Sequence, residues 1–91
     1  MSESAKAASR YEIVVLNDDF TPMEFVIAIL QDVFKMTKEE AVRAMLHTHR
    51  RGTHAVAVMD KAEAEATVNH IHERARAAKH PFQCILREQA P

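Results

Sequence analysis

The chain has 91 residues, of which 47% are hydrophobic and 27% are charged, and this composition is typical of one soluble globular domain. Twelve basic and thirteen acidic side chains give a net charge of −1, which argues against binding to nucleic acid or to an anionic membrane. The only cysteine, Cys84, excludes an internal disulfide. With no apolar run of about twenty residues and no signal-peptide pattern, these features predict a cytoplasmic protein.

A tail, a strand and a helix are predicted first along the chain. Residues 1–10 are small, polar and aperiodic, so we expect a flexible tail. Residues 11–16 (YEIVVL) are rich in β-branched side chains and form an apolar run, which predicts a strand in the centre of a sheet. Residues 22–34 carry apolar side chains at spacings of three and four, which predicts a helix with one wide apolar face.

The segment between this strand and this helix is polar and contains no glycine. Residues 17–19 (Asn-Asp-Asp) follow the strand directly. Thr21 is expected to cap the helix, and Glu24, three residues later, is expected to complete a capping box. Phe20 and Phe25 have the spacing of a hydrophobic staple around this cap. We therefore expect an ordered turn that holds its polar side chains at the edge of a binding site.

A second helix and a second strand follow. Thr37 and Glu40 form a capping box that predicts a helix start. Basic residues near its end and Gly52, the only glycine, predict that this helix stops at residue 51. Residues 54–59 (HAVAVM) are then expected to form a strand.

The remaining residues predict a third helix and a third strand. Asp60 is expected to cap a helix that continues to about Ala78, and residues 82–87 (FQCILR) alternate as a strand. The order strand-helix-helix-strand-helix-strand predicts an α+β domain with the helices on one face of the sheet. The domain is expected to span residues 11–88, and residues 89–91 to form a C-terminal tail.

The two first helices are expected to bring an apolar pocket close to the Asn-Asp-Asp turn. Side chains on their inner faces would line it: Met23, Val26 and Met45. The rim would be rich in hydrogen-bond acceptors from the turn and from the second helix: Asn17, Asp18, Asp19 and His49. Such a site suits a ligand that combines a positively charged donor with a bulky apolar group.

The α-amino group of a peptide with a large first side chain fits this description. Its ammonium has three donors and a pKa near about 8, so it is charged at neutral pH. His49 can accept a hydrogen bond only when its ring is neutral, so we expect acidification to weaken binding.

Residues 15–26 (VLNDDFTPMEFV) resemble the signature of the ClpS family, whose members are small adaptors that recognise N-end-rule degrons. Further matches are Met45-Leu46, His49, Gly52 and the His80-Pro81 pair followed by Cys84. The similarity spans roughly residues 11 to 88. It implies three antiparallel strands and three helices, and a protein without enzymatic activity or a cofactor.

The resemblance also implies roles for individual residues. Asn17 and His49 would hold the α-amino group of the degron, Asp18 would bind its early backbone, and Asp19 would contribute to the same rim. Met23 would act as a gate against β-branched first residues. The pocket for a first residue such as Phe, Leu, Trp or Tyr would be lined by Val15, Thr21, Met23, Val26, Met45, Thr48 and Phe82. Thr48 and Phe82 stand where the best-known members carry aliphatic residues.

The implied partner is the N-terminal domain of a ClpA-type or ClpC-type unfoldase, which passes substrates to ClpP. Phe20, Glu63 and Glu65 are the candidates for docking this unfoldase, with the adaptor acting as a monomer. Family members often carry Glu and Lys on the third helix for this contact, and the matching positions here are Ala62 and Thr67.

Two alternatives belong to other functional classes. One is a non-catalytic interaction module of the ribosomal-stalk type, which would use a surface patch. The other is a small hydrolase that would use Cys84 or Asp18 with His49. A metal site is not expected, because residues two apart on a helix, such as His47 and His49, point about 200° apart. The same holds for His70 and His72.

Overall fold

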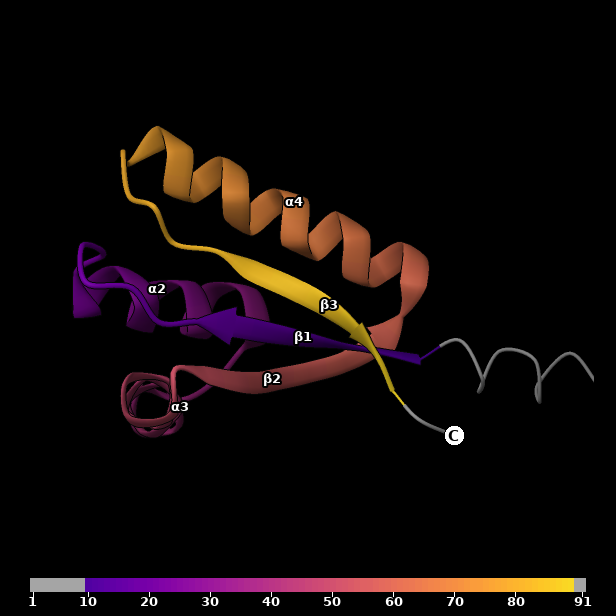
Figure 1. The fold of residues 1–91 in the computed structure, drawn as a ribbon, viewed down its shortest axis with the longest axis horizontal. Helices are drawn as coiled ribbons and strands as arrows, with labels where there is room; N and C mark the ends of the chain where they lie inside the picture. The colour runs from indigo at the N-terminus through magenta and orange to yellow at the C-terminus, as the bar shows by residue number, and fades with distance from the viewer. Residues whose placement is uncertain (1–9, 90–91) are drawn as a thin grey trace, which may run out of the picture.

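The computed structural model describes residues 10–89 and contains three helices and three strands in the predicted order. Figure 1 shows strand β1 in the middle of the sheet, with helix α4 running along the side of β3. The elements are β1 (Arg10–Leu16), α2 (Met23–Phe34), α3 (Lys38–Arg51), β2 (Thr53–Asp60), α4 (Lys61–Ala77) and β3 (Cys84–Glu88). Arg10, assigned from the sequence to the tail, is the first residue of β1, and residues 1–9, 90 and 91 lie outside the described part.

The sheet is antiparallel and has the strand order β2-β1-β3. The predicted α+β class and the central position of the first strand are therefore confirmed. Arg10 pairs with Asp60 at one end of β1, and Leu16 pairs with Thr53 at the other. The turn that follows Leu16 thus lies at the end of the sheet where β2 begins.

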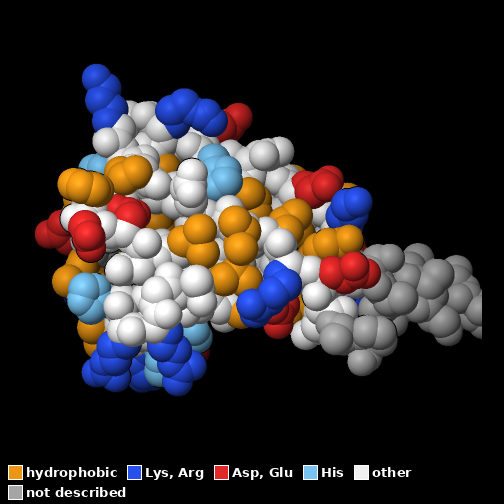
Figure 2. Space-filling model, in the orientation of Figure 1, with side chains coloured by type: hydrophobic (Ala, Val, Ile, Leu, Met, Phe, Trp, Pro, Cys, Tyr) orange, Lys and Arg blue, Asp and Glu red, His pale blue; other side chains and the backbone are white. Residues whose placement is uncertain are grey.

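One continuous core lies between the sheet and the helices. From β1, the fully buried Ile13 and Val15 belong to it. Each helix adds small or aliphatic side chains to the same cluster: Val26, Ile29, Leu30, Ala41, Ala44, Met45, Ala64, Ile71 and Ala75. All three helices therefore pack on one face of the sheet. On the other face, Ile85 pairs with Val14 and is 48% exposed. Figure 2 shows apolar side chains gathered over the strands.

Local caps explain why the helices begin and end where they do. The Thr37 hydroxyl accepts the Glu40 amide at 3.1 Å and the Glu40 carboxylate accepts the Thr37 amide at 2.9 Å, so the predicted capping box is confirmed. Asp60 caps α4 by accepting the Glu63 amide at 2.8 Å. Gly52 ends α3 in the left-handed region at φ 88°, a conformation in which a side chain would be strained.

Candidate functional site

Backbone hydrogen bonds tie the end of β1 and the first residue of the turn after it to the segments that lead into β2 and β3. The Asn17 amide donates to the Gly52 carbonyl at 2.8 Å, and the Leu16 amide donates to the Gln83 carbonyl at 3.1 Å. Gly52 in turn donates its own amide to the Thr48 carbonyl at 2.8 Å. The end of α3, which carries His49, is therefore held at a fixed position relative to Asn17.

Asp18 organises the inside of the turn. Its Oδ1 accepts the amides of Phe20 at 2.8 Å and Thr21 at 2.7 Å, and its Oδ2 accepts the Thr21 hydroxyl at 2.8 Å. Partial burial alone would raise the pKa of Asp18, but these hydrogen bonds and the nearby His80 outweigh it and lower that pKa. The carboxylate is thus ionised at neutral pH and most of its acceptor capacity is used within the turn.

The predicted capping box at the start of α2 is wrong. Thr21 donates its hydroxyl to Asp18, and Pro22 occupies the cap position without a side-chain hydrogen bond. The predicted staple is also wrong, because Phe20 is 80% exposed. Instead, the Pro22 carbonyl accepts the Phe25 amide at 3.1 Å to begin the helix. The polar turn, and not the helix cap, determines where Thr21 points.

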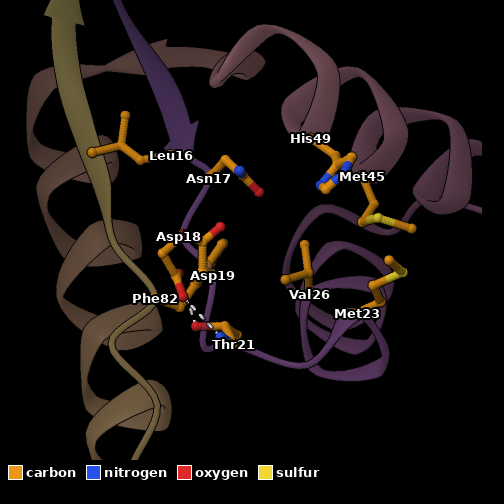
Figure 3. Close-up of a pocket in the computed structure, with 10 residues that line it drawn as sticks. All are labelled: Leu16, Asn17, Asp18, Asp19, Thr21, Met23, Val26, Met45, His49 and Phe82. Carbon is orange, nitrogen blue, oxygen red and sulfur yellow. Dashed lines mark hydrogen bonds between the residues drawn. The ribbon is translucent and has the colours of Figure 1, made fainter.

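A pocket with a cavity of about 170 Å³ opens beside this turn (Figure 3). It takes residues from β1, the turn, both helices of the α2–α3 pair and the segment before β3. Its lining comprises Leu16, Asn17, Asp18, Asp19, Thr21, Met23, Val26, Met45, His49 and Phe82. Nine of these ten were predicted from the sequence as rim or pocket residues.

Three side chains differ from the prediction. Val15 is 0% exposed and belongs to the core, and Thr48 is 3% exposed with its hydroxyl donating to the Ala44 carbonyl at 2.8 Å. Neither side chain is among those that line the pocket. Leu16 lines the pocket but was not predicted, although its place as the last strand residue before the turn could have indicated it.

The rim presents polar side chains that are free to meet a ligand. Asn17, Asp19 and His49 are exposed, and no hydrogen bond within residues 10–89 engages their side chains. Figure 3 shows the side chains of Asn17 and His49 pointing toward one another across the pocket mouth. Met23, 55% exposed, lies on the same mouth. The arrangement offers unpaired acceptors and the free carboxylate of Asp19, beside the carboxylate that Asp18 uses within the turn, at the mouth of a cavity with apolar side chains on its walls.

The residues expected to dock the unfoldase are split between two ends of the molecule. Phe20 lies in the turn after Leu16, at one end of β1. Glu63 and Glu65 are exposed near the start of α4, directly after Asp60, which pairs with the other end of β1. A strand of seven residues spans about 20 Å. Phe20 therefore does not share one surface with the two glutamates.

Cys84 lacks the surroundings of a nucleophile. It is 2% exposed, and burial raises the pKa of its thiol to about 11, so the thiol is protonated at neutral pH. Its histidine neighbour is His72, whose Nε2 lies 3.9 Å from Sγ and accepts the Cys84 amide at 3.2 Å. Within residues 10–89 there is no group of three or more potential metal ligands, and none of the helices described could span a membrane.

Comparisons with known proteins match nearly the whole chain. The family model described as "ATP-dependent Clp protease adaptor protein ClpS" matches residues 6–85. The chain belongs to the ClpS family. It is 46% identical over 81 residues to the Rhodospirillum centenum ClpS, covering 89% of this chain and 75% of that protein. It is 43% identical over 86 residues to the Burkholderia thailandensis ClpS, covering 94% of this chain and 83% of that protein.

A solved ClpS structure has the same fold. The Agrobacterium tumefaciens ClpS2 bound to L-phenylalaninamide superposes with a TM-score of 0.87 at 30% identity, covering 90% of this chain and 99% of that chain. ClpS proteins are adaptors of the Clp protease and not catalytic enzymes. Family membership thus favours the adaptor over both the hydrolase and the interaction module of the ribosomal-stalk type.

Proposed function

We propose that this ClpS protein binds N-degrons, recognising a free α-amino group and a bulky hydrophobic first side chain, and delivers them to a ClpA-type unfoldase in the cytoplasm. One observation carries the proposal. A cavity of about 170 Å³, with apolar side chains on its walls, opens beside a rim on which the acceptors of Asn17, Asp19 and His49 have no partner within residues 10–89. The first residue of a peptide carries a charged α-amino group next to its side chain. A large apolar first residue would therefore use both the acceptors of the rim and the cavity.

The rim supplies partners for each part of the ammonium group. The Asn17 carbonyl oxygen and a neutral His49 nitrogen accept two N–H bonds, and Asp19 supplies the opposite charge. Asp18 already accepts three hydrogen bonds, so we assign it the role of holding the turn, with at most one acceptor position left for the peptide backbone. This division of roles differs from the one implied by the family resemblance.

The apolar cavity supplies the preference for a bulky first residue. A protein cavity of about 150 Å³ can hold a benzene ring, so a phenyl group suits the volume here. L-phenylalaninamide, which the Agrobacterium ClpS2 binds, has a free α-amino group beside such a ring. Burial of one aromatic side chain contributes about 1.5–3 kcal/mol and each charge-assisted bond about 1.5–3 kcal/mol. Together these reach the ~8 kcal/mol of micromolar affinity.

Delivery needs a second surface that stays free when the pocket is occupied. We assign it to the exposed start of α4, with Glu63 and Glu65, because this end of β1 lies about 20 Å from the degron pocket. Phe20 lies in the turn beside the pocket, so we assign it to contact with the bound substrate and not with the unfoldase. The protein would act as a monomer that bridges a degron and the unfoldase N-terminal domain.

Fluorescence anisotropy with labelled peptides tests recognition. Peptides that differ only in the first residue, Phe or Leu against Ser, are compared with their N-acetylated forms. We expect micromolar binding of the Phe peptide, lost on acetylation. Equal binding of the acetylated and free forms would refute recognition of the α-amino group. Degradation of a Phe-initiated fusion protein by ClpA and ClpP, with wild type against a Glu63→Lys/Glu65→Lys variant, tests delivery separately.

A further inference from the structure

One wall of the pocket is aromatic. Phe82 is 3% exposed and lines the cavity. Figure 3 shows it across the pocket from Val26 and Met23. Its ring meets Phe25 edge-on, with ring centroids 6.2 Å apart and an interplanar angle of 77°. Phe25 in turn meets the His80 ring at 4.9 Å and 70°. We call these three rings, Phe25, His80 and Phe82, the aromatic wall: Phe82 faces the cavity, and Phe25 and His80 support it from behind without lining the cavity.

The backbone at His80, one end of the aromatic wall, is anchored to the end of α4. After α4, the Lys79 amide donates to the Arg76 carbonyl at 3.0 Å and the His80 amide donates to the Ala75 carbonyl at 2.8 Å, with Lys79 in the left-handed region at φ 63°. This pair of bonds is a Schellman motif, and it anchors His80 to the end of the helix. Phe82 follows two residues later and is 3% exposed, so packing restricts its ring close to this anchor.

We propose that Phe82 makes this pocket prefer aromatic first residues over leucine. The inference rests on the proposed function and names the substrate class of the same site. An aromatic side chain entering the cavity can meet the Phe82 ring in the edge-to-face or offset geometry that aromatic pairs favour. A leucine side chain meets the same ring through dispersion alone. On the opposite side of the cavity, Val26 offers aliphatic contacts, and Met23 and Met45 offer thioether contacts.

The contribution of Phe82 can be separated from that of the methionines. Methionine sulfur also favours aromatic rings, so the selectivity of the wild type alone does not identify its source. The quantity to measure is the ratio of Kd for a Leu-initiated peptide to Kd for the otherwise identical Phe-initiated peptide. In Phe82→Leu we expect this ratio to fall about two- to twelve-fold, the equivalent of an aromatic pair at about 0.5–1.5 kcal/mol.

Four further variants separate the effect of the Phe82 ring from a simple loss of folding. Phe82→Ile keeps a large aliphatic side chain in the wall with neither a ring nor a sulfur atom, and the ratio should fall as it does in Phe82→Leu. Ile29→Val trims a fully buried residue outside the pocket, so it lowers stability while leaving the ratio unchanged. His80→Phe should keep the ratio, and His80→Ala should lower it, because only the latter removes a ring that packs on Phe25.

The outcomes distinguish this inference from the proposed function. If the wild type binds Leu and Phe peptides equally, or if both Phe82 variants bind peptide with an unchanged ratio, Phe82 does not set the preference and the inference is refuted. Degron recognition would survive either result. If no free-amino peptide binds the wild type, the proposed function fails and the inference fails with it.

Discussion

The two acidic residues of the turn have different partners in the structure, and this difference predicts different mutational effects. Asp18 accepts three hydrogen bonds from its own turn, whereas the exposed Asp19 accepts none within residues 10–89. We predict that Asp18→Ala lowers stability and affinity together. Asp19→Ala should lower affinity and leave stability within about 0.5 kcal/mol of the wild type.

The size of the Asp18 effect follows from its bonds. Each intramolecular hydrogen bond contributes about 0.5–1.5 kcal/mol net, and the partial exposure of this turn favours the lower part of that range. Loss of a side-chain cap with similar bonding costs about 0.5–2 kcal/mol. We therefore expect Asp18→Ala to reduce the free energy of unfolding by about 1–2 kcal/mol. For a domain of this size, the Tm should fall by about 5–15 °C.

Urea denaturation followed by circular dichroism gives the stability, and peptide anisotropy gives the affinity. Asp19→Asn is the matched control, because it removes the charge of Asp19 and keeps its shape. A normal Tm for Asp18→Ala combined with weak binding would refute the positioning role and make Asp18 a direct ligand. A large loss of stability in Asp19→Ala would show that Asp19 also holds the turn.

Four other residues or properties of the structure give predictions that can be tested one substitution or one reagent at a time. Gly52→Ala should lower the free energy of unfolding by about 1–2 kcal/mol, because the backbone at φ 88° is strained for a residue with a side chain. The added Cβ itself would meet nothing within 4 Å. Urea denaturation measures the loss, and Gly52→Asn, the control, should lose less stability. The lowered pKa of Asp18 stabilises the fold above the unfolded pKa of about 3.9. The stability difference between wild type and Asp18→Asn, measured by urea denaturation, should therefore stay constant from pH 5 to about 7 and shrink as the pH falls through the folded pKa; a difference independent of pH would contradict this. Iodoacetamide should alkylate the native Cys84 far more slowly than the same thiol in urea, since burial raises its pKa to about 11; equal rates would refute this. Met23→Ala should admit peptides that begin with Ile or Val, measured by anisotropy, because this side chain partly covers the pocket mouth; unchanged selectivity would argue against a gate.

Helix ends that depend on residues close together in the chain were mostly predicted correctly from the sequence. The Thr37–Glu40 box, the Asp60 cap and the Gly52 stop are all formed by groups at most three or four residues apart. The order of the elements follows from these signals and from apolar periodicity. The central place of β1 could also be predicted, because its apolar run indicated burial on both faces.

The errors and omissions have three sources: competition between two hydrogen-bond partners, the exact direction of a side chain on a helix, and contacts between segments far apart in the chain. Thr21 could cap α2 or donate to Asp18, and the sequence pattern alone favoured the cap. Thr48 precedes His49 by one position, which turns it about 100° away from the pocket and into the core. The contacts of Phe82 with Phe25 join segments far apart in the chain, so no local pattern could predict the aromatic wall.

The pairing of β1 with strands that come much later has a consequence for synthesis. Tyr11 pairs with Met59 on one side and with Glu88 on the other, and the pocket includes Phe82. The pairing with β3 cannot form until that strand has left the ribosome, and contacts between such distant segments make folding slow relative to a helical bundle. A chain whose β3 has not yet emerged therefore has no complete pocket. The pocket therefore forms only in a late step of assembly, because the segment that carries Phe82 is held against the sheet once β3 pairs with β1.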